Sequence, residues 1–181
     1  DCVAFGNAER LPINICLCYK SITFDGCNFY VTLPEAGKVV VLDRRFCVLG
    51  TIDVKEKYDS ITYDSVDNVF YATLFRNNKL DKNFCKIATI PVSIPDLGCQ
   101  AICSISFNCQ TNRIVLVIAG NIVEINKDGT LACKITPFGM NNVCYAISLA
   151  PYYIAIINRN GKQYIKVIDP NTCCDSCEQR I

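Results

Sequence analysis

A unit of four short strands recurs along this chain of 181 residues, and its period restricts the fold more than any other feature. The first strand of each copy begins at Ser21, Ser60, Ser104 and Ala146, at spacings of 39, 44 and 42 residues. The four copies read Ser-Ile-Thr-Phe, Ser-Ile-Thr-Tyr, Ser-Ile-Ser-Phe and, more loosely, Ala-Ile-Ser-Leu. A period of about 40 to 45 residues is typical of the blades of β-propellers.

The first copy shows the strands most clearly. Alternating or β-branched segments are separated by Asp-Gly, Pro-Glu-Ala-Gly and Asp-Arg-Arg turn sequences, which predicts an up-and-down antiparallel sheet. The four segments are Ser21–Phe24, Asn28–Leu33, Lys38–Leu42 and Cys47–Val54. No window keeps apolar residues at a helical period for three turns. The sequence therefore predicts an all-β, β-propeller-like fold with about four repeats of four-stranded antiparallel blades, at about 21–59, 60–101, 102–143 and 144–181.

The two ends of the chain raise the question of how the series of blades closes. Residues 1–20 form an extension with one surplus strand at Leu11–Cys18, whereas Asn171–Ile181 is polar and predicts a poor outer strand for the last blade. The N-terminal strand is thus expected to complete the last blade, either of its own chain or of the next one. A closed four-blade ring, a two-chain ring and an open series of subunits remain alternatives.

Part of the first copy resembles a known repeat. Tyr30-Val-Thr, followed by Gly37-Lys-Val-Val-Val-Leu-Asp and by Gly50-Thr-Ile, resembles the YVTN and NHL type of β-propeller repeat. This resemblance implies the propeller fold and leaves function open, because propellers serve many functions. In its high content of cysteine, the chain also resembles surface or spore-associated proteins of anaerobic Gram-positive bacteria. That resemblance implies an extracellular or surface location, with the cytoplasm of an anaerobe as the alternative.

Composition narrows the classes of partner. Hydrophobic residues make up 51% of the chain and charged residues 19%, so the polar surface is sparse and association with further subunits is favoured. The net charge of +1 offers no concentrated basic face for nucleic acid. The longest nearly apolar run, Ala146–Ile157, contains Ser148 and Pro151 and is too short to span a membrane. No nucleic-acid binding and no membrane insertion are predicted.

Residue types argue against an enzyme. Histidine, the commonest general base and metal ligand, is absent. The aspartates that recur do so at equivalent turns, which turn chemistry explains without a catalytic centre: Asp25, Asp43, Asp64, Asp81 and Asp169. No catalytic, cofactor-binding or metal-binding residues are predicted.

Two groups stand out among the fourteen cysteines. Cys47, Cys85 and Cys133 recur at the start of the outer strand, together with Cys174, and are expected to pack as small hydrophobic side chains. The terminal group is the candidate for disulfides within or between chains: Cys2, Cys16, Cys18, Cys173, Cys174 and Cys177. Zinc or iron–sulfur ligation and a redox pair are alternatives, weakened by the single Cys-x-x-Cys and by its lack of a strand-to-helix context.

Three aromatic residues occupy one position in the innermost strands. Phe24, Tyr63 and Phe107 follow the repeated serine by three residues, and we expect them to be buried between blades. Their expected role is packing rather than stacking on a ligand.

Two functions follow from these observations. The first is a non-enzymatic structural protein that self-assembles, as a homo-oligomer or filament, through strand exchange and disulfides on a cell or spore surface. The alternative is a soluble propeller that binds a protein or glycan on one face of the ring. That face would carry the longer links between repeats, Lys55–Asp59, Ser93–Ala101 and Pro137–Asn142.

Overall fold

The computed structural model describes residues 20–73, 77–92, 94, 101–135, 143–149, 151–169 and 175–180, and of residues 159 and 175–180 it describes the backbone alone. These residues form sixteen strands in four antiparallel sheets of four strands each. The strands of each sheet follow one another in chain order, so each sheet is one up-and-down meander, or blade.

The bounds of the strands are as follows. Blade 1 contains β1 (Ile22–Phe24), β2 (Phe29–Leu33), β3 (Lys38–Leu42) and β4 (Val48–Asp53). Blade 2 contains β5 (Ser60–Asp64), β6 (Val69–Thr73), β7 (Asn77–Leu80) and β8 (Lys86–Ile90). Blade 3 contains β9 (Ile102–Asn108), β10 (Arg113–Ile118), β11 (Asn121–Ile125) and β12 (Leu131–Ile135). Blade 4 contains β13 (Val143–Leu149), β14 (Tyr152–Arg159), β15 (Lys162–Ile168) and β16 (Asp175–Arg180).

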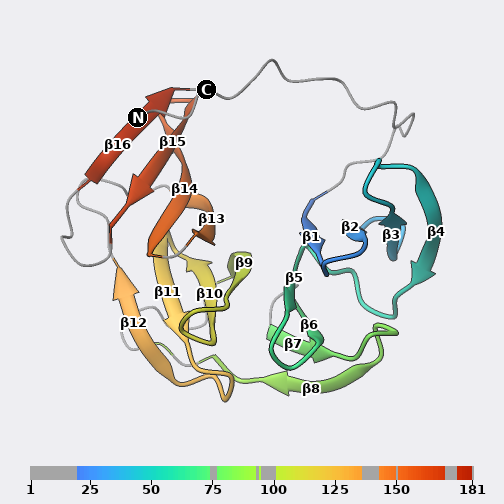
Figure 1. Ribbon diagram of the computed structural model, residues 1–181. Coiled ribbons are helices and arrows are strands. Elements are labelled where there is room, and N and C mark those ends of the chain that lie inside the picture. The colour runs from blue at the N-terminus through green and yellow to red at the C-terminus, as the bar shows by residue number, and fades with distance from the viewer. Residues whose placement is uncertain are drawn as a thin grey trace.

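The four blades stand around a common centre, with β1, β5, β9 and β13 innermost (Figure 1). This arrangement is a four-bladed β-propeller, so the predicted fold class is confirmed. The strands of blade 1 begin and end within one residue of the predicted ranges. The agreement is close because alternating apolar residues and turn residues act locally.

Aspartates close the turns between strands. The Oδ1 atoms of Asp43 and Asp81 each accept two backbone N–H groups at 2.8 Å, in the same turn of blades 1 and 2. Asp25 and Asp64 likewise accept two backbone N–H groups in the turns that follow β1 and β5. The turn role predicted for these four residues is therefore confirmed.

Hydroxyl groups join the innermost strands of neighbouring blades. Each of the first three blades presents a buried serine that accepts a backbone N–H from the inner strand of the next blade. The three bonds are Ile61 N–H to Ser21 Oγ at 3.1 Å, Ile105 N–H to Ser60 Oγ at 3.1 Å and Ala146 N–H to Ser104 Oγ at 3.2 Å. These bonds give each of the first three blades the same register relative to the next one.

The fourth repeat is offset by one residue from its predicted alignment. Ala146 takes the place of the N–H donors of blades 2 and 3, so Tyr145, and not Ala146, is equivalent to the repeated serine. The cause lies in the sequence: Tyr145 replaces the repeated serine, so the likeness of Ala-Ile-Ser-Leu to Ser-Ile-Ser-Phe set the alignment one residue too late. β13 also has a β-bulge at Cys144, as β9 has at Cys103, so the bulge does not displace blade 4 relative to blade 3.

The last blade has its own outer strand. β16 pairs antiparallel with β15, from Asp175 to Arg180. The prediction that this edge is left for the N-terminal strand is therefore wrong. An outermost strand needs backbone hydrogen bonds on one side only, so a polar sequence can form it. The predicted strand Leu11–Cys18 lies outside the described residues.

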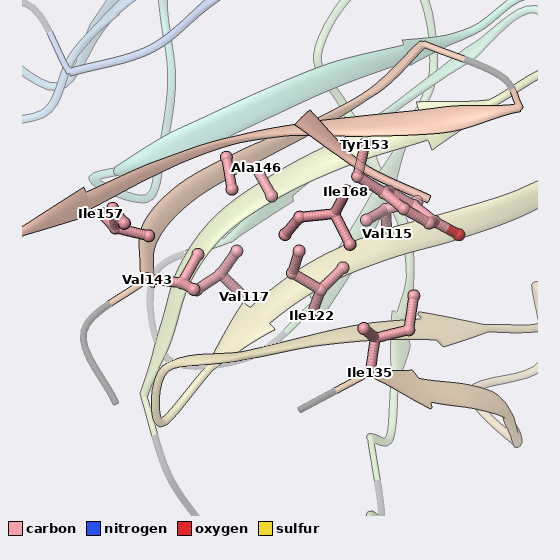
Figure 2. Packing of buried hydrophobic residues seen from close by; sticks show 10 residues of the cluster. Val115, Val117, Ile122, Ile135, Val143, Ala146, Tyr153, Ile157 and Ile168 are labelled. Carbon is pink, nitrogen blue, oxygen red and sulfur yellow. The ribbon is translucent and has the colours of Figure 1, made fainter. Parts of the chain in front are cut away.

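Hydrophobic side chains pack in layers between successive blades. One layer lies between blades 1 and 2, a second between blades 2 and 3 and a third between blades 3 and 4. Figure 2 shows the third, where Val115, Val117, Ile122 and Ile135 of blade 3 meet Val143, Ala146, Tyr153, Ile157 and Ile168 of blade 4. Burial of a large apolar side chain contributes about 1.5–3 kcal/mol, so these layers are the main source of stability.

Candidate functional site at the first and last blades

One position of the repeat differs in exposure between the first blade and the others. Ile61, Ile105 and Ala146 are 1%, 1% and 0% exposed because the preceding blade covers them. The equivalent residue of blade 1, Ile22, is 47% exposed. In the part of the chain that the structure describes, β1 does not pack along β13 as the other neighbouring inner strands pack along each other.

The face of blade 1 that is turned away from blade 2 is apolar. Val31, Leu33, Val40 and Leu42 form a buried cluster on this face. At its edges Phe24 and Val48 are 40% and 53% exposed. Phe24 also contacts Phe29, with ring centroids 4.6 Å apart, and so extends the cluster toward solvent.

The face of blade 4 that is turned away from blade 3 is also apolar. Alternation along β13 directs Ala146 toward blade 3, so Ile147 and Leu149 lie on the opposite face. Ile147, Leu149 and Tyr152 are 38%, 60% and 42% exposed. In blades 1 and 3 the position of Ile147 carries hydroxyl residues, Thr23 and Ser106, that accept an N–H from the next blade.

Tyr145 and Ser21 link the inner strands of blades 4 and 1. Burial raises the pKa of Tyr145, and a hydrogen bond with the side chain of Ser21 offsets part of that rise. The link lies near the start of β13 and just before β1, whereas Leu149 and Phe24 end these strands. We name the exposed apolar residues of the two end faces the end-blade patch: Ile22, Phe24, Val48, Ile147, Leu149 and Tyr152.

The three aromatic residues of the inner strands, Phe24, Tyr63 and Phe107, do not share one environment. Phe24 is exposed, so the prediction that it is buried between blades is wrong, whereas Tyr63 and Phe107 are half-buried. The difference follows from the junctions: Tyr63 and Phe107 lie on strands that pack along the preceding inner strand, whereas β1 does not pack along β13. The end-blade patch was missed for the same reason. The available signal was that no chain segment joins the last copy to the first, so their junction need not match the three internal ones.

The repeated cysteines at the outer strands do not share one environment. Cys47 and Cys85 are exposed, which contradicts the packing role predicted for them, because each lies in a turn outside the blade. Cys133 is half-buried and packs against the layer between blades 3 and 4. All seven cysteines whose side chains the structure describes are thiols.

The terminal cysteines proposed for disulfides are largely outside the described residues. Cys2, Cys16, Cys18, Cys173 and Cys174 all fall there. Cys177 lies in β16, where the backbone alone is described. Covalent joining through these residues stays a prediction.

A buried ion pair links blades 2 and 3. The Nζ atom of Lys127 lies 2.6 Å from Oδ2 of Asp64, whose side chain is fully buried, and 3.1 Å from Oδ2 of Asp67. Lys127 also lies over the ring of Phe107, 5.2 Å from its centroid. The hydrogen bond from Lys127 holds the pKa of Asp67 below its ordinary value, and burial offsets this in part.

A second buried carboxylate, Glu124, joins blades 3 and 4. In blade 1, Asp25 supports a turn. Glu124 Oε1 accepts hydrogen bonds from Tyr153 Oη at 2.5 Å and from Asn108 Nδ2 at 2.9 Å. Burial, and then the hydrogen bond to Asp25, raises the pKa of Tyr30 to about 12. These carboxylates hold blades and turns together, which leaves them poorly placed for proton transfer to a substrate.

Two further properties concern the described part of the chain. It contains no group of three or more Cys, Asp or Glu side chains placed to hold a metal ion. Nor does any helix there have the length and apolar character needed to cross a membrane.

No protein family matches the sequence, and no curated protein does so either. Solved structures do match the fold. Hydrazine synthase of Kuenenia stuttgartiensis is similar over 90% of this chain and 49% of its own, with 16% identity and a TM-score of 0.63. The nidogen/laminin complex contains a chain that is similar over 90% of this chain and 64% of its own, with 12% identity and a TM-score of 0.62.

A third match is a protein of unknown function from Bacteroides caccae. It covers 88% of this chain and 60% of its own, with 7% identity and a TM-score of 0.56. The chain thus spans about half to two thirds of the length of the proteins it resembles. Identities this low show the fold alone.

Proposed function

We propose that this chain is a non-enzymatic structural protein that associates with copies of itself through the end-blade patch. The observation that carries the proposal is the exposure of Ile22, which is 47% where its equivalents Ile61 and Ile105 are each 1% exposed. The same repeat position is therefore covered by a neighbouring blade in the middle of the series and left open at its beginning.

The three internal junctions indicate which partner suits the end faces. At each of them an apolar blade face packs against an apolar face of the next repeat. A second copy of this chain supplies faces of the same chemistry, and the smallest assembly that covers the patch on both copies is a dimer. A chain with 51% hydrophobic and 19% charged residues favours such burial.

The assignment as a non-enzymatic protein rests on the chemistry of its side chains. Histidine is absent from the sequence, and four of the recurring aspartates accept backbone hydrogen bonds in turns. A location on a cell or spore surface, with terminal disulfides that reinforce the contact, belongs to the same proposal and follows from the number of cysteines and their concentration at the two ends of the chain.

The experiment measures the molar mass of the full chain by size-exclusion chromatography with light scattering, under reducing conditions so that disulfides do not contribute. We expect an oligomer that dissociates in the double variant Val48→Lys/Leu149→Lys. These side chains are 53% and 60% exposed, so the variant should keep its β-type circular dichroism. Ile87→Lys is the matched control, because Ile87 is 54% exposed on β8 of an internal blade.

Three outcomes would contradict the proposal. A monomeric wild-type chain favours the alternative function, a module that binds a protein or glycan. An oligomer that survives Val48→Lys/Leu149→Lys does not use the patch. An oligomer lost on deletion of residues 1–18, but kept in the double variant, is held by the N-terminal strand instead.

A further inference from the structure

The third strand of blade 2 carries a buried asparagine where blades 1 and 3 carry an aliphatic side chain. Asn77 pairs with Thr73 of β6 and with Ile90 of β8. In the rows of paired residues that begin at the repeated serine of the inner strand, Val39 and Ile122 hold the place of Asn77. These three residues are each 0% exposed. Blade 2 therefore has a polar side chain in a place where the repeat otherwise makes an apolar contact.

Thr73 and Asn77 lie side by side in the layer between blades 2 and 3. Alternation along β6 puts Thr73 on the same face as Tyr71, which belongs to that layer. Asn77 is directly opposite Thr73 in the antiparallel pair, so both side chains are on this face, with Cβ atoms about 4.5–5.5 Å apart. The residues that blade 3 contributes to the layer are hydrophobic, among them Ile102 and Ile105.

Neither side chain has a hydrogen-bond partner among the residues that the structure describes. The unpaired atoms are Oγ1 of Thr73 and both Oδ1 and Nδ2 of Asn77. In blade 1 the equivalent threonine, Thr32, is paired, because its hydroxyl donates to the carbonyl oxygen of Asp59 at 3.4 Å. A buried amide or hydroxyl without a partner lowers stability, whereas a valine or isoleucine in the same place does not. Two adjacent side chains of this kind indicate a bound ligand.

The unpaired atoms select the kind of ligand. The hydroxyl of Thr73 donates and accepts, whereas Nδ2 of Asn77 only donates and its Oδ1 only accepts. A metal cation would leave Nδ2 unpaired, and an anion would leave Oδ1 unpaired. Water donates and accepts, and an internal water needs at least two polar partners, which these two side chains supply. In blade 3 this place holds Ile122, a larger side chain, so the repeat can provide more volume there than an asparagine fills.

We propose that Thr73 and Asn77 bind at least one internal water molecule, which bridges the hydroxyl and the amide in the layer between blades 2 and 3. The water joins the ends of β6 and β7 on the face that blade 3 covers. The site lies within a single chain and does not depend on association through the end-blade patch.

The test measures the oxygen-17 relaxation dispersion of water in a solution of the full chain, which counts the water molecules held for longer than the tumbling time of the protein. We expect the double variant Thr73→Val/Asn77→Val to hold at least one such molecule fewer than the wild type. Valine occurs at the equivalent places in other blades, as Val117 and Val39, so the variant should keep its β-type circular dichroism. In the wild type, a nuclear Overhauser effect between water and the Nδ2 protons of Asn77 should locate the molecule.

Tyr71→Phe is the matched control. The hydroxyl of Tyr71 is also buried and has no hydrogen-bond partner in the described part of the chain. Burial, and then the charges of Asp64 and Asp67, raise the pKa of Tyr71, and these two aspartates lie at the opposite end of the strands from Thr73. The control should hold as many water molecules as the wild type.

An equal number of held water molecules in the double variant and the wild type would overturn the proposal, as would an equal loss in Tyr71→Phe. If the double variant fails to fold, the nuclear Overhauser effect in the wild type decides the question. Its presence at the Nδ2 protons of Asn77 supports the site, and its absence overturns the proposal.

Discussion

The backbone N–H of Ile105 donates a hydrogen bond of 3.1 Å to Oγ of Ser60, and this bond joins the inner strands of blades 2 and 3. Both residues are buried, at 1% and 2% exposure. The same contact recurs at the junctions on either side, from Ile61 to Ser21 and from Ala146 to Ser104. A buried N–H that loses its acceptor keeps the full cost of its desolvation, so each serine contributes to how firmly two blades are joined.

Removal of one serine hydroxyl should weaken a blade junction. We expect Ser60→Ala to lower the free energy of unfolding by about 1–3 kcal/mol, because the N–H of Ile105 is then buried without its acceptor. Urea denaturation followed by circular dichroism measures the change. Ser65→Ala, in an exposed turn, is the control and should stay within about 0.5 kcal/mol of the wild type. Equal losses in the two variants would contradict a structural role for the Ser60 hydroxyl.

Two equivalent faces of the repeat should respond differently to loss of an aromatic ring. Phe70 is 1% exposed and stacks on Phe84 with centroids 4.6 Å apart, so Phe70→Ala should lower the free energy of unfolding by about 3–5 kcal/mol. Phe24→Ala should cost less than half as much, because Phe24 is 40% exposed. Denaturant midpoints of both variants test this order. A larger loss for Phe24 would mean that the end face of blade 1 is covered in solution.

Two turn glycines, Gly26 and Gly129, both have positive φ, but only at Gly129 would a Cβ atom also meet a close neighbour. A Cβ atom at Gly129 would lie 2.0 Å from the carbonyl oxygen of Pro91, and its φ is 92°. Gly26 has a similar φ of 97° with nothing within 4 Å, so Gly26→Ala should cost only the strain of a left-handed backbone, about 1–3 kcal/mol. Gly129→Ala should cost clearly more, since Pro91 must also move. Similar thermal midpoints for the two variants would contradict the close approach.

The buried ion pair should be sensitive to loss of its cation. Lys127→Met leaves the fully buried carboxylate of Asp64 without its partner at 2.6 Å, and we expect a loss of about 3 kcal/mol or more in the free energy of unfolding. Lys79→Met is the control, because Lys79 lies 3.5 Å from the partly exposed Asp67, and it should cost less than about 1 kcal/mol. The double variant Asp64→Asn/Lys127→Met should recover part of the loss. No recovery would mean that the cost arises from packing of the lysine stem.

The contact of Asp67 with Lys127 predicts that the stability of the fold falls at acid pH. The pKa of Asp67 is below its ordinary value of 3.8 in the folded chain, so its contribution is present above that value and is lost as the pH falls through the folded pKa. We expect the Tm of Asp67→Asn to fall less steeply than that of the wild type between about pH 4 and pH 2. Thermal unfolding at a series of pH values tests this, with Glu35→Gln in an exposed turn as the control. Parallel curves for Asp67→Asn and the wild type would contradict the prediction.

The environment of each repeat copy could be predicted only in part. The serine of the inner strand is a recurring feature of the sequence, but its role as acceptor for the next blade became visible only when β1 and β5 were placed side by side. The alignment of the fourth copy failed by one residue because Tyr145 stands where the other copies have the serine. The bulges at Cys103 and Cys144 could not be predicted either, because a bulge is formed between two strands and leaves the repeat period almost unchanged.

The sequence by itself determined the strands, the turns and their grouping into four blades, because alternation and aspartate turns act over a few neighbouring residues. Only the tertiary structure decided which blade faces are covered. Ile22 and Ile61 have the same local sequence, Ser-Ile-Thr, and differ in exposure because β5 packs along β1 whereas β1 does not pack along β13. Burial depends on what lies across a junction some 40 residues away in the chain, and no local pattern records that neighbour.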